Sequence, residues 1–186
     1  MGRGSFAKGI ARYSTLTLDG NVLAQVKKGS LSFFCGKMGA GKSTLARQLA
    51  ADEGAVLLSE DDWLAALYPN QIFTLADYVE CSARLKAPVK TLVQSMLLAG
   101  TDVVMDFPAN TTAQRAWLRE VFSEVGAEHC LVYIDLADAV CLKRIEQRRL
   151  TEPGRASTDT PEMFAQVTRY FEAPSPAEGF TLKVYE

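Results

Sequence analysis

Eight consecutive residues of this chain have the types and the spacing of a phosphate-binding loop. The run Gly36-Lys37-Met38-Gly39-Ala40-Gly41-Lys42-Ser43 matches the pattern G-x-x-x-x-G-K-S/T in full. Glycines allow positive φ angles and let backbone N–H groups approach phosphate oxygens, and the positive end of the following helix attracts the same anion. Lys42 is expected to reach the β- and γ-phosphates, and Ser43 to offer its hydroxyl to Mg²⁺. The motif, with Thr44 after it, predicts a nucleoside triphosphate site.

An aspartate after the apolar run Val103-Val104-Met105 belongs to the same chemistry. P-loop proteins place an aspartate that organises Mg²⁺ at the end of such a strand, so Asp106 is predicted to assist Ser43. Phe107 follows it, at the position where ATPases of the motor and AAA+ type carry a glutamate that activates water. This difference favours phosphoryl transfer to a substrate hydroxyl over hydrolysis. The alternative interpretation of Asp106 is a cap at the end of the strand.

Three adjacent carboxylates, Glu60-Asp61-Asp62, follow another apolar run, Ala55 to Leu58. The carboxyl ends of parallel strands form the binding rim of a doubly wound sheet, so these side chains are expected at that rim. Asp61 is a candidate general base that accepts the proton of an attacking hydroxyl. The alternative is that Asp61 is the N-cap of the next helix or a partner of its dipole.

Two arginines, Arg144 and Arg148, are four residues apart and share one face of a predicted helix. They precede a polar stretch that we interpret as a lid over about residues 149–161. Arginines on a closing segment stabilise the charge of a phosphoryl group during transfer. The alternative is a solvated basic helix face.

The elements that must position these residues alternate between strand and helix. Apolar runs predict strands at residues 31–35, 55–58, 103–105, 130–134 and near 181–185. Patterns of helical period lie between them, and the longest, from about Leu75 to Ala99, contains Pro88, which predicts a break or kink. The alternation predicts an α/β fold, a P-loop NTPase with a five-stranded, mainly parallel sheet and helices on both faces.

The length and the net charge of the chain limit which classes of protein it can belong to. The 186 residues are enough for one domain, and the net charge of −2 argues against a protein that coats nucleic acid. Residues 1–30 carry five basic side chains and one acidic one, which leaves −6 for the rest of the chain. We interpret residues 1–30 as a basic N-terminal arm or an added hairpin leading into 22–26, and residues 31–186 as the catalytic domain.

Compartment and partners follow from what the chain lacks. No apolar run approaches the ~18–20 residues that cross a bilayer, and no apolar segment of the secretory type follows the basic N-terminus. We therefore expect no membrane partner and a cytoplasmic location. The cysteines contain no C-x-x-C pair and are interpreted as buried free thiols, and His129 as structural.

Together these motifs resemble the small P-loop kinases of the group that contains polynucleotide kinases, zeta toxins and chloramphenicol phosphotransferase-like enzymes. Many members of this group are known only as AAA-type ATP-binding proteins or kinases. The resemblance covers about residues 31–186. It rests on Gly36–Ser43, Glu60-Asp61-Asp62, Val103–Asp106 with Asn110 and Arg115, Lys143-Arg144 with Arg148, Tyr170–Pro174, and Glu178–Phe180.

The resemblance implies a phosphotransferase that uses ATP and Mg²⁺ and takes a hydroxyl of a small molecule, nucleoside or sugar nucleotide as acceptor. Asp61 is similar to the carboxylate that activates the acceptor hydroxyl, and Arg148 to the lid arginine that reaches the transferred phosphate. Asp106 and Asn110 fall in the segment that lines the acceptor side. Leu64 stands where polynucleotide kinases carry the arginine that holds the acceptor phosphate, which counts against an acceptor held in that way.

Two rival functions fit parts of the same pattern. One is a nucleotide-dependent switch or binding module whose partner surface is the basic arm. The other is a polynucleotide 5′-hydroxyl kinase that uses this arm to contact a strand, although nucleic acid is not the favoured partner. A toxin kinase acting on a peptidoglycan precursor is a weaker option. The acceptor, the base preference of the nucleotide site and the oligomeric state are not predicted from these residues.

Overall fold

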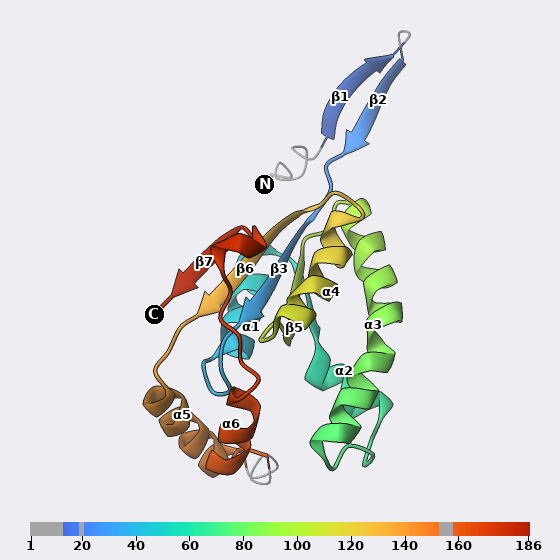
Figure 1. Ribbon diagram of the computed structural model, residues 1–186. Helices are drawn as coiled ribbons and strands as arrows, with labels where there is room; N and C mark the ends of the chain where they lie inside the picture. Colours follow the sequence, from blue (N-terminus) through green and yellow to red (C-terminus); the bar gives the residue numbers. More distant parts are fainter. Residues whose placement is uncertain (1–12, 19–20, 153–157) are drawn as a thin grey trace, which may run out of the picture.

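A parallel β-sheet forms the centre of the molecule (Figure 1). The computed structural model describes residues 13–18, 21–152 and 158–186, with side chains from residue 27 onward. Among these residues the sheet has the strand order β4-β5-β3-β6-β7, and each neighbouring pair is parallel. Its strands are β3 (Ser30–Cys35), β4 (Val56–Ser59), β5 (Val103–Pro108), β6 (Glu128–Ile134) and β7 (Leu182–Tyr185). The predicted α/β class with five strands is confirmed, and the sheet is wholly parallel.

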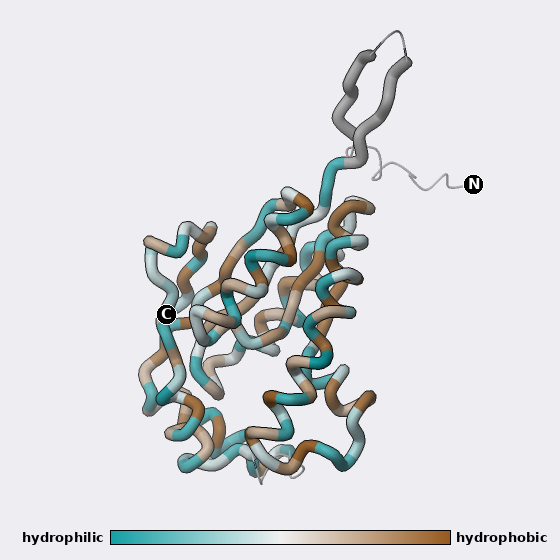
Figure 2. The backbone as a smooth tube through the Cα atoms, turned by 45° about the vertical axis from the view of Figure 1, so that its right-hand side comes forward, coloured by the Kyte–Doolittle hydropathy of each residue, from teal (hydrophilic) through white to brown (hydrophobic). Residues whose placement is uncertain are grey.

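Helices cover both faces of this sheet. They are α1 (Lys42–Glu53), α2 (Glu60–Leu67), α3 (Leu75–Leu98), α4 (Thr112–Ser123), α5 (Asp138–Thr151) and α6 (Pro161–Thr168), with the 3₁₀ turn η2 (Pro176–Glu178). Side chains alternate between the two faces of a strand, so the fully buried neighbours Phe33 and Phe34 of β3 enter different cores. Phe33 packs with residues of α3 and α4, and Phe34 with residues of α1, α5 and α6. Figure 2 shows hydrophobic and hydrophilic residues mixed along the helices, which fits helices with one buried side.

The longest helix, α3, runs unbroken through Pro88, so the predicted break does not occur. Its buried residues form one stripe at the spacing of successive turns, namely Cys81, Leu85, Val89, Val93 and Leu97. This stripe packs into one core on both sides of the proline, and the packing offsets the lost backbone hydrogen bond. A capping box, in which Thr74 and Asp77 bond each other's backbone, begins the helix.

Two predicted strands have different bounds in the structure close to the site. The second strand of the domain, β4, is Val56–Ser59 and not residues 55–58. The strand β5 continues past Asp106 to Pro108, so Asp106 lies inside the strand. The reason is that β5 pairs with both neighbours at this point: Ser59 of β4 faces Asp106, and Phe34 of β3 faces Pro108 after a shift in register.

Two predicted segments are described only in part. Strands β1 (Tyr13–Leu18) and β2 (Asn21–Val26) pair in antiparallel fashion and form a separate two-stranded sheet. Of the predicted arm or hairpin at residues 1–30, residues 1–12 and 19–20 lie outside the described residues, and the domain boundary at residue 30 remains a prediction. The predicted lid spans residues 149–161, of which 153–157 also lie outside them. None of the described helices is long and apolar enough to cross a membrane.

Candidate active site

The P-loop connects the carboxyl end of the central strand β3 to the first turn of α1. Gly41 is the N-cap of α1 with φ 101°, and Gly39 has φ 77°, a left-handed region that other residues rarely adopt. A Cβ atom at Gly39 would also lie 2.6 Å from the carbonyl oxygen of Cys141 on α5. Glycine is therefore required at both positions, and the positive end of the α1 dipole lies at the loop.

Lys42 folds back over the loop that precedes it. Its Nζ donates hydrogen bonds to the carbonyl oxygens of Gly36, at 2.5 Å, and of Lys37, at 3.0 Å. Burial lowers the pKa of Lys42, and the nearby Asp106 carboxylate acts in the opposite direction. An ammonium group has three N–H donors, so one remains for a phosphate oxygen.

Ser43, Asp106 and Asp61 come together at the carboxyl ends of β4 and β5. The Ser43 hydroxyl donates a hydrogen bond to the Asp106 carboxylate. Burial raises the pKa of Asp106, the Ser43 bond lowers it, and the negative charge of Asp61 raises it. Asp61 is exposed in the first turn of α2, and the charges of Lys42 and Asp61 both act on Asp106. The predicted metal pair and the predicted base therefore share one small region.

The Ser43–Asp106 pair has the chemistry of a magnesium site. Both side chains offer oxygen atoms, which are the ligands that Mg²⁺ prefers. In the part of the chain that the structure describes, no group of three or more His, Cys, Asp or Glu side chains forms a cage for a metal. Mg²⁺ does not need such a cage, because it is usually held by one or two protein oxygens together with substrate phosphates and water. The pair therefore fits a magnesium ion bound together with a triphosphate.

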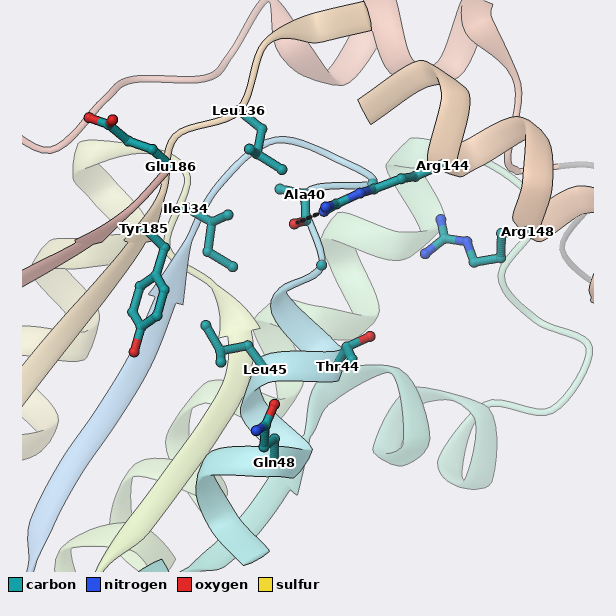
Figure 3. Close-up of a pocket in the computed structure, with 12 residues that line it drawn as sticks. Ala40, Thr44, Leu45, Gln48, Ile134, Leu136, Arg144, Arg148, Tyr185 and Glu186 are labelled. Atoms are coloured by element: carbon teal, nitrogen blue, oxygen red, sulfur yellow. Dashed lines mark hydrogen bonds between the residues drawn. The ribbon is translucent and has the colours of Figure 1, made fainter. Parts of the chain in front are cut away.

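A cavity of about 480 Å³ lies beside the P-loop (Figure 3). Its wall is partly apolar and partly polar, and it is formed by Gly39, Ala40, Gly41, Thr44, Leu45, Gln48, Ile134, Leu136, Arg144, Arg148, Tyr185 and Glu186. The P-loop, the first turns of α1, the ends of β6 and β7, and α5 thus contribute to one space. Thr44, predicted as a binding residue only by its place in the motif, is among them.

Both predicted lid arginines lie at the edge of this cavity. Arg144 donates from Nη1 to the carbonyl oxygen of Ala40, at 2.8 Å, and so ties α5 to the P-loop. Arg148 donates from Nε and Nη2 to the two carboxylate oxygens of Asp159, at 2.5 and 2.7 Å. Burial is the main cause of the lowered pKa of Lys42, and the nearby positive charge of Arg148 lowers this pKa further.

The remaining P-loop residues are held by neighbours that the motif does not reveal. Asn110, which the resemblance assigns to the acceptor side, accepts a hydrogen bond from the Gly36 N–H through Oδ1, at 3.0 Å. Lys37 forms a salt bridge with Asp138 at the start of α5. Met38 packs against the core that contains α5. These contacts hold the loop from both sides.

The first of the three adjacent carboxylates has a structural role. Glu60 is only 4% exposed, and it accepts hydrogen bonds from the Tyr78 hydroxyl, at 2.5 Å, and from Ser82 Oγ, at 2.6 Å. These bonds join α2 to α3, and burial raises the pKa of Glu60. The N-cap of α2 is Ser59, which accepts from the Asp62 N–H, so the N-cap interpretation of Asp61 is wrong. Asp61 lies one residue further on and is exposed at the rim.

Other residues named by the resemblance are structural. Arg115, almost fully buried, donates to both carboxylate oxygens of Glu178 and to the carbonyl oxygens of Ala109 and Glu172. These bonds fasten the segment after α6 to the start of α4.

The sequence did not point to the carboxylate that holds Arg148, nor to the polar cavity residue Gln48. Asp159 stands next to the N-cap Thr160 and has no motif around it, and Gln48 is one polar residue on an exposed helix face. No local signal distinguishes either residue, because each acquires its place only when distant segments pack.

The fold and site define a P-loop protein with the architecture of small kinases. The chain belongs to the AAA domain family, whose model matches residues 31–174. The predicted resemblance to small P-loop kinases is thereby confirmed at the level of family and fold. No curated protein sequence matches the chain.

Solved structures share this fold. The APS kinase CysC of Mycobacterium tuberculosis, in complex with AMPPNP and APS, is 23% identical over 80% of this chain and 84% of its own, with a TM-score of 0.53. A sugar kinase from Janibacter sp. HTCC2649 is 17% identical over 85% and 84%, with a TM-score of 0.56. The protein APE1195 is 22% identical over 87% of both chains, with a TM-score of 0.61.

Proposed function

We propose that this protein is an ATP- and Mg²⁺-dependent phosphotransferase whose acceptor is a hydroxyl of a small molecule, nucleoside or nucleotide. One observation carries the proposal. Asp61, Ser43 and Lys42 all lie close enough to Asp106 to act on it, while Arg144 and Arg148 line the cavity beside the P-loop. A carboxylate at the rim, a metal pair and arginines around one phosphate-binding loop are the parts of phosphoryl transfer.

Each group then has a defined task. Lys42 and the loop amides bind the β- and γ-phosphates, and Arg144 and Arg148 stabilise the charge on the transferred group. Asp61 accepts the proton of the acceptor hydroxyl, whose oxygen bonds to the γ-phosphorus while the bond to the β-phosphate oxygen breaks and ADP leaves. Mg²⁺ held by Ser43 and Asp106 would neutralise the charge of the phosphates.

The cavity beside the P-loop is the place we propose for the nucleoside. Its apolar wall, Leu45, Ile134 and Leu136, suits a base, and Gln48 and Tyr185 offer polar groups to its edge. The solved relatives include an APS kinase in complex with AMPPNP and a sugar kinase, which agrees with a nucleotide-dependent transferase. The four cysteines are free thiols, which suits the cytoplasmic location that we propose.

The polynucleotide-kinase alternative has little support from the site. Leu64 is buried in the core of the sheet face that α3 covers, so its position presents no group to an acceptor phosphate. If the protein nevertheless phosphorylates 5′-ends, oligonucleotide binding must be measurable and must weaken steeply between low and physiological salt. Binding that is absent or insensitive to salt excludes this alternative.

The main test is a screen of metabolite extract with γ-labelled ATP. The wild-type protein should produce a labelled species other than free phosphate, and Lys42→Ala should not. Asp61→Asn should abolish transfer while ATP affinity stays within about threefold, since a base acts only in the chemical step. Asp62→Asn is the matched control, a carboxylate in the same helical turn, and should keep transfer. Label only in free phosphate, or an indifferent Asp61→Asn, contradicts the proposal and favours the switch.

A further inference from the structure

The carboxylate that holds Arg148 is more deeply buried than the arginine itself. Asp159 is 0% exposed, while the Arg148 side chain is 30% exposed. Two hydrogen bonds, of 2.5 and 2.7 Å, join the two groups edge to edge. Ion pairs of this kind hold a guanidinium in one plane, because both groups are flat and the bonds are parallel. The pair therefore has a fixed, buried side and a side that faces outward.

The outward side of Arg148 faces the P-loop. A guanidinium has five N–H donors, and Asp159 takes one from Nε and one from Nη2. Among the residues that the structure describes, this leaves three donors, one on Nη2 and two on Nη1. Arg148 lines the cavity beside the P-loop, and Figure 3 shows its guanidinium directed toward the side where Arg144 and Ala40 lie. Its charge also acts on Lys42. The donors not used by Asp159 are thus on the side where a triphosphate would bind.

Asp159 is itself held in place by the start of α6. The residue after it, Thr160, caps this helix by accepting a hydrogen bond from the Met163 N–H at 3.1 Å. Phe164, on the next turn, is buried in the core that also contains Ile145 of α5. The two helices are therefore packed together, and the distance between Asp159 and Arg148 depends on this packing and not on a free loop.

We propose that Asp159 is a positioning residue for phosphoryl transfer. It orients Arg148 so that the unused N–H groups of the guanidinium meet the phosphoryl group as it leaves ATP. This inference rests on the proposed function and deepens it. Without Asp159 the arginine keeps its charge but samples other orientations. The transition state then loses more of the stabilisation that Arg148 gives than the ground state does.

The test compares four proteins: wild type, Asp159→Asn, Arg148→Ala and the double variant. Turnover of γ-labelled ATP should fall about 10–100-fold in Asp159→Asn, the usual cost of losing a group that orients a ligand. It should fall about 10²–10³-fold in Arg148→Ala. In the double variant, Asp159→Asn should add less than about twofold, because a residue that acts through Arg148 has no effect once Arg148 is gone.

The relative affinity for ATP and ADP is a second measurement, and it would not change if Asp159 had only a structural role. The affinity for ADP should stay within about threefold of wild type in Asp159→Asn, while the preference for ATP over ADP should shrink. Arg148→Lys, which keeps the charge but has no fork, should resemble Asp159→Asn. Glu124→Gln, which removes an exposed partner of Lys90 on the α3–α4 side, should leave both readouts unchanged.

Three results would overturn the inference. They are unchanged turnover in Asp159→Asn, an equal further loss in the Arg148→Ala background, or a parallel loss of ADP and ATP affinity. Should Asp159→Asn fail to fold, Asp159→Glu and Arg148→Lys carry the same comparison. Failure of the proposed function looks different: the wild-type protein itself would then give label only in free phosphate, whether or not it binds ATP.

Discussion

Two arginine–carboxylate pairs of the same geometry occupy opposite situations in this molecule. In the Arg115–Glu178 pair, the arginine is 1% exposed and the carboxylate 17%. In the Arg148–Asp159 pair, the arginine is 30% exposed and the carboxylate 0%. Both arginines use Nε and Nη2 for their carboxylate. The burial of the partners is thus reversed between the pairs.

The difference shows which pair is available for chemistry. The Nη1 group of Arg115 donates to the carbonyl oxygens of Ala109 and Glu172, so four of its five donors are used within the protein. Arg148 keeps an open edge at the cavity beside the P-loop. A guanidinium surrounded by acceptors fastens segments together, whereas one held only from behind can bind an anion. The role of each arginine is therefore indicated by whether the arginine is the exposed partner of its pair, and not by the ion pair itself.

The largest expected effect is on stability at the buried arginine. Glu178→Gln should lower the free energy of unfolding by about 3 kcal/mol, because it leaves the buried Arg115 guanidinium without its counter-charge. Asp159→Asn should lower it by less than about 1 kcal/mol, since water reaches Arg148 and replaces part of the lost interaction. Urea denaturation of both variants measures the contrast. Equal losses would show that the burial of the arginine is not what separates the pairs.

The next largest effect is on the turnover of ATP, and we expect it for changes in the Arg148–Asp159 pair. Arg148→Lys keeps the positive charge but loses the two parallel hydrogen bonds, and turnover of ATP should drop about 30-fold, which corresponds to about 2 kcal/mol. Arg115→Lys should instead lower stability, with nucleotide affinity within about threefold for the protein that remains folded. Steady-state kinetics check the turnover of Arg148→Lys, and nucleotide titration checks the affinity of Arg115→Lys. A larger drop in turnover for Arg115→Lys would contradict the assignment.

A smaller effect depends on pH and concerns the pair that stabilises the fold. The hydrogen bonds from Arg115 hold the pKa of Glu178 below the usual glutamate value of about 4.5. The unfolded chain therefore takes up a proton first as pH falls, so this part of the stability is present above pH ~4.5 and is lost as pH falls toward the lower folded-state pKa. Glu178→Gln should show a shallower decrease in stability over this range, and denaturation at a series of pH values tests it. Parallel curves would mean that the pair contributes nothing to acid unfolding.

The smallest effect concerns the link between the two regions. Asn110 accepts from the Gly36 N–H of the P-loop through its side chain, and its carbonyl oxygen accepts from the Glu172 N–H in the segment that Arg115 fastens. Asn110→Ala should weaken ATP binding about fivefold, the equivalent of one neutral hydrogen bond of about 1 kcal/mol. Nucleotide titration measures it, with Ser123→Ala, at the exposed last residue of α4, as the control. An unchanged affinity would show that the P-loop keeps its shape without this bond.

Local patterns were enough to predict much of the fold and to propose the P-loop residues of the site. The P-loop is readable because glycine, lysine and serine act there through their own backbone and side-chain chemistry, at positions close in the chain. The strand–helix alternation is readable because a strand buried on both faces must be apolar throughout. The break predicted at Pro88 does not occur, because a residue's preference is weaker than the packing of the buried stripe on α3.

The order of amino acids alone was sufficient for the loop, the α/β class, and the candidates Lys42, Ser43, Asp61 and Asp106. It did not show that Glu60 turns inward, because that depends on Tyr78 and Ser82 of another helix. Nor did it join Arg148 to Asp159, a pair that forms only because α5 and α6 pack against each other. Contacts of this kind join residues far apart in the chain, and only the folded sheet and its helices bring them within hydrogen-bond distance.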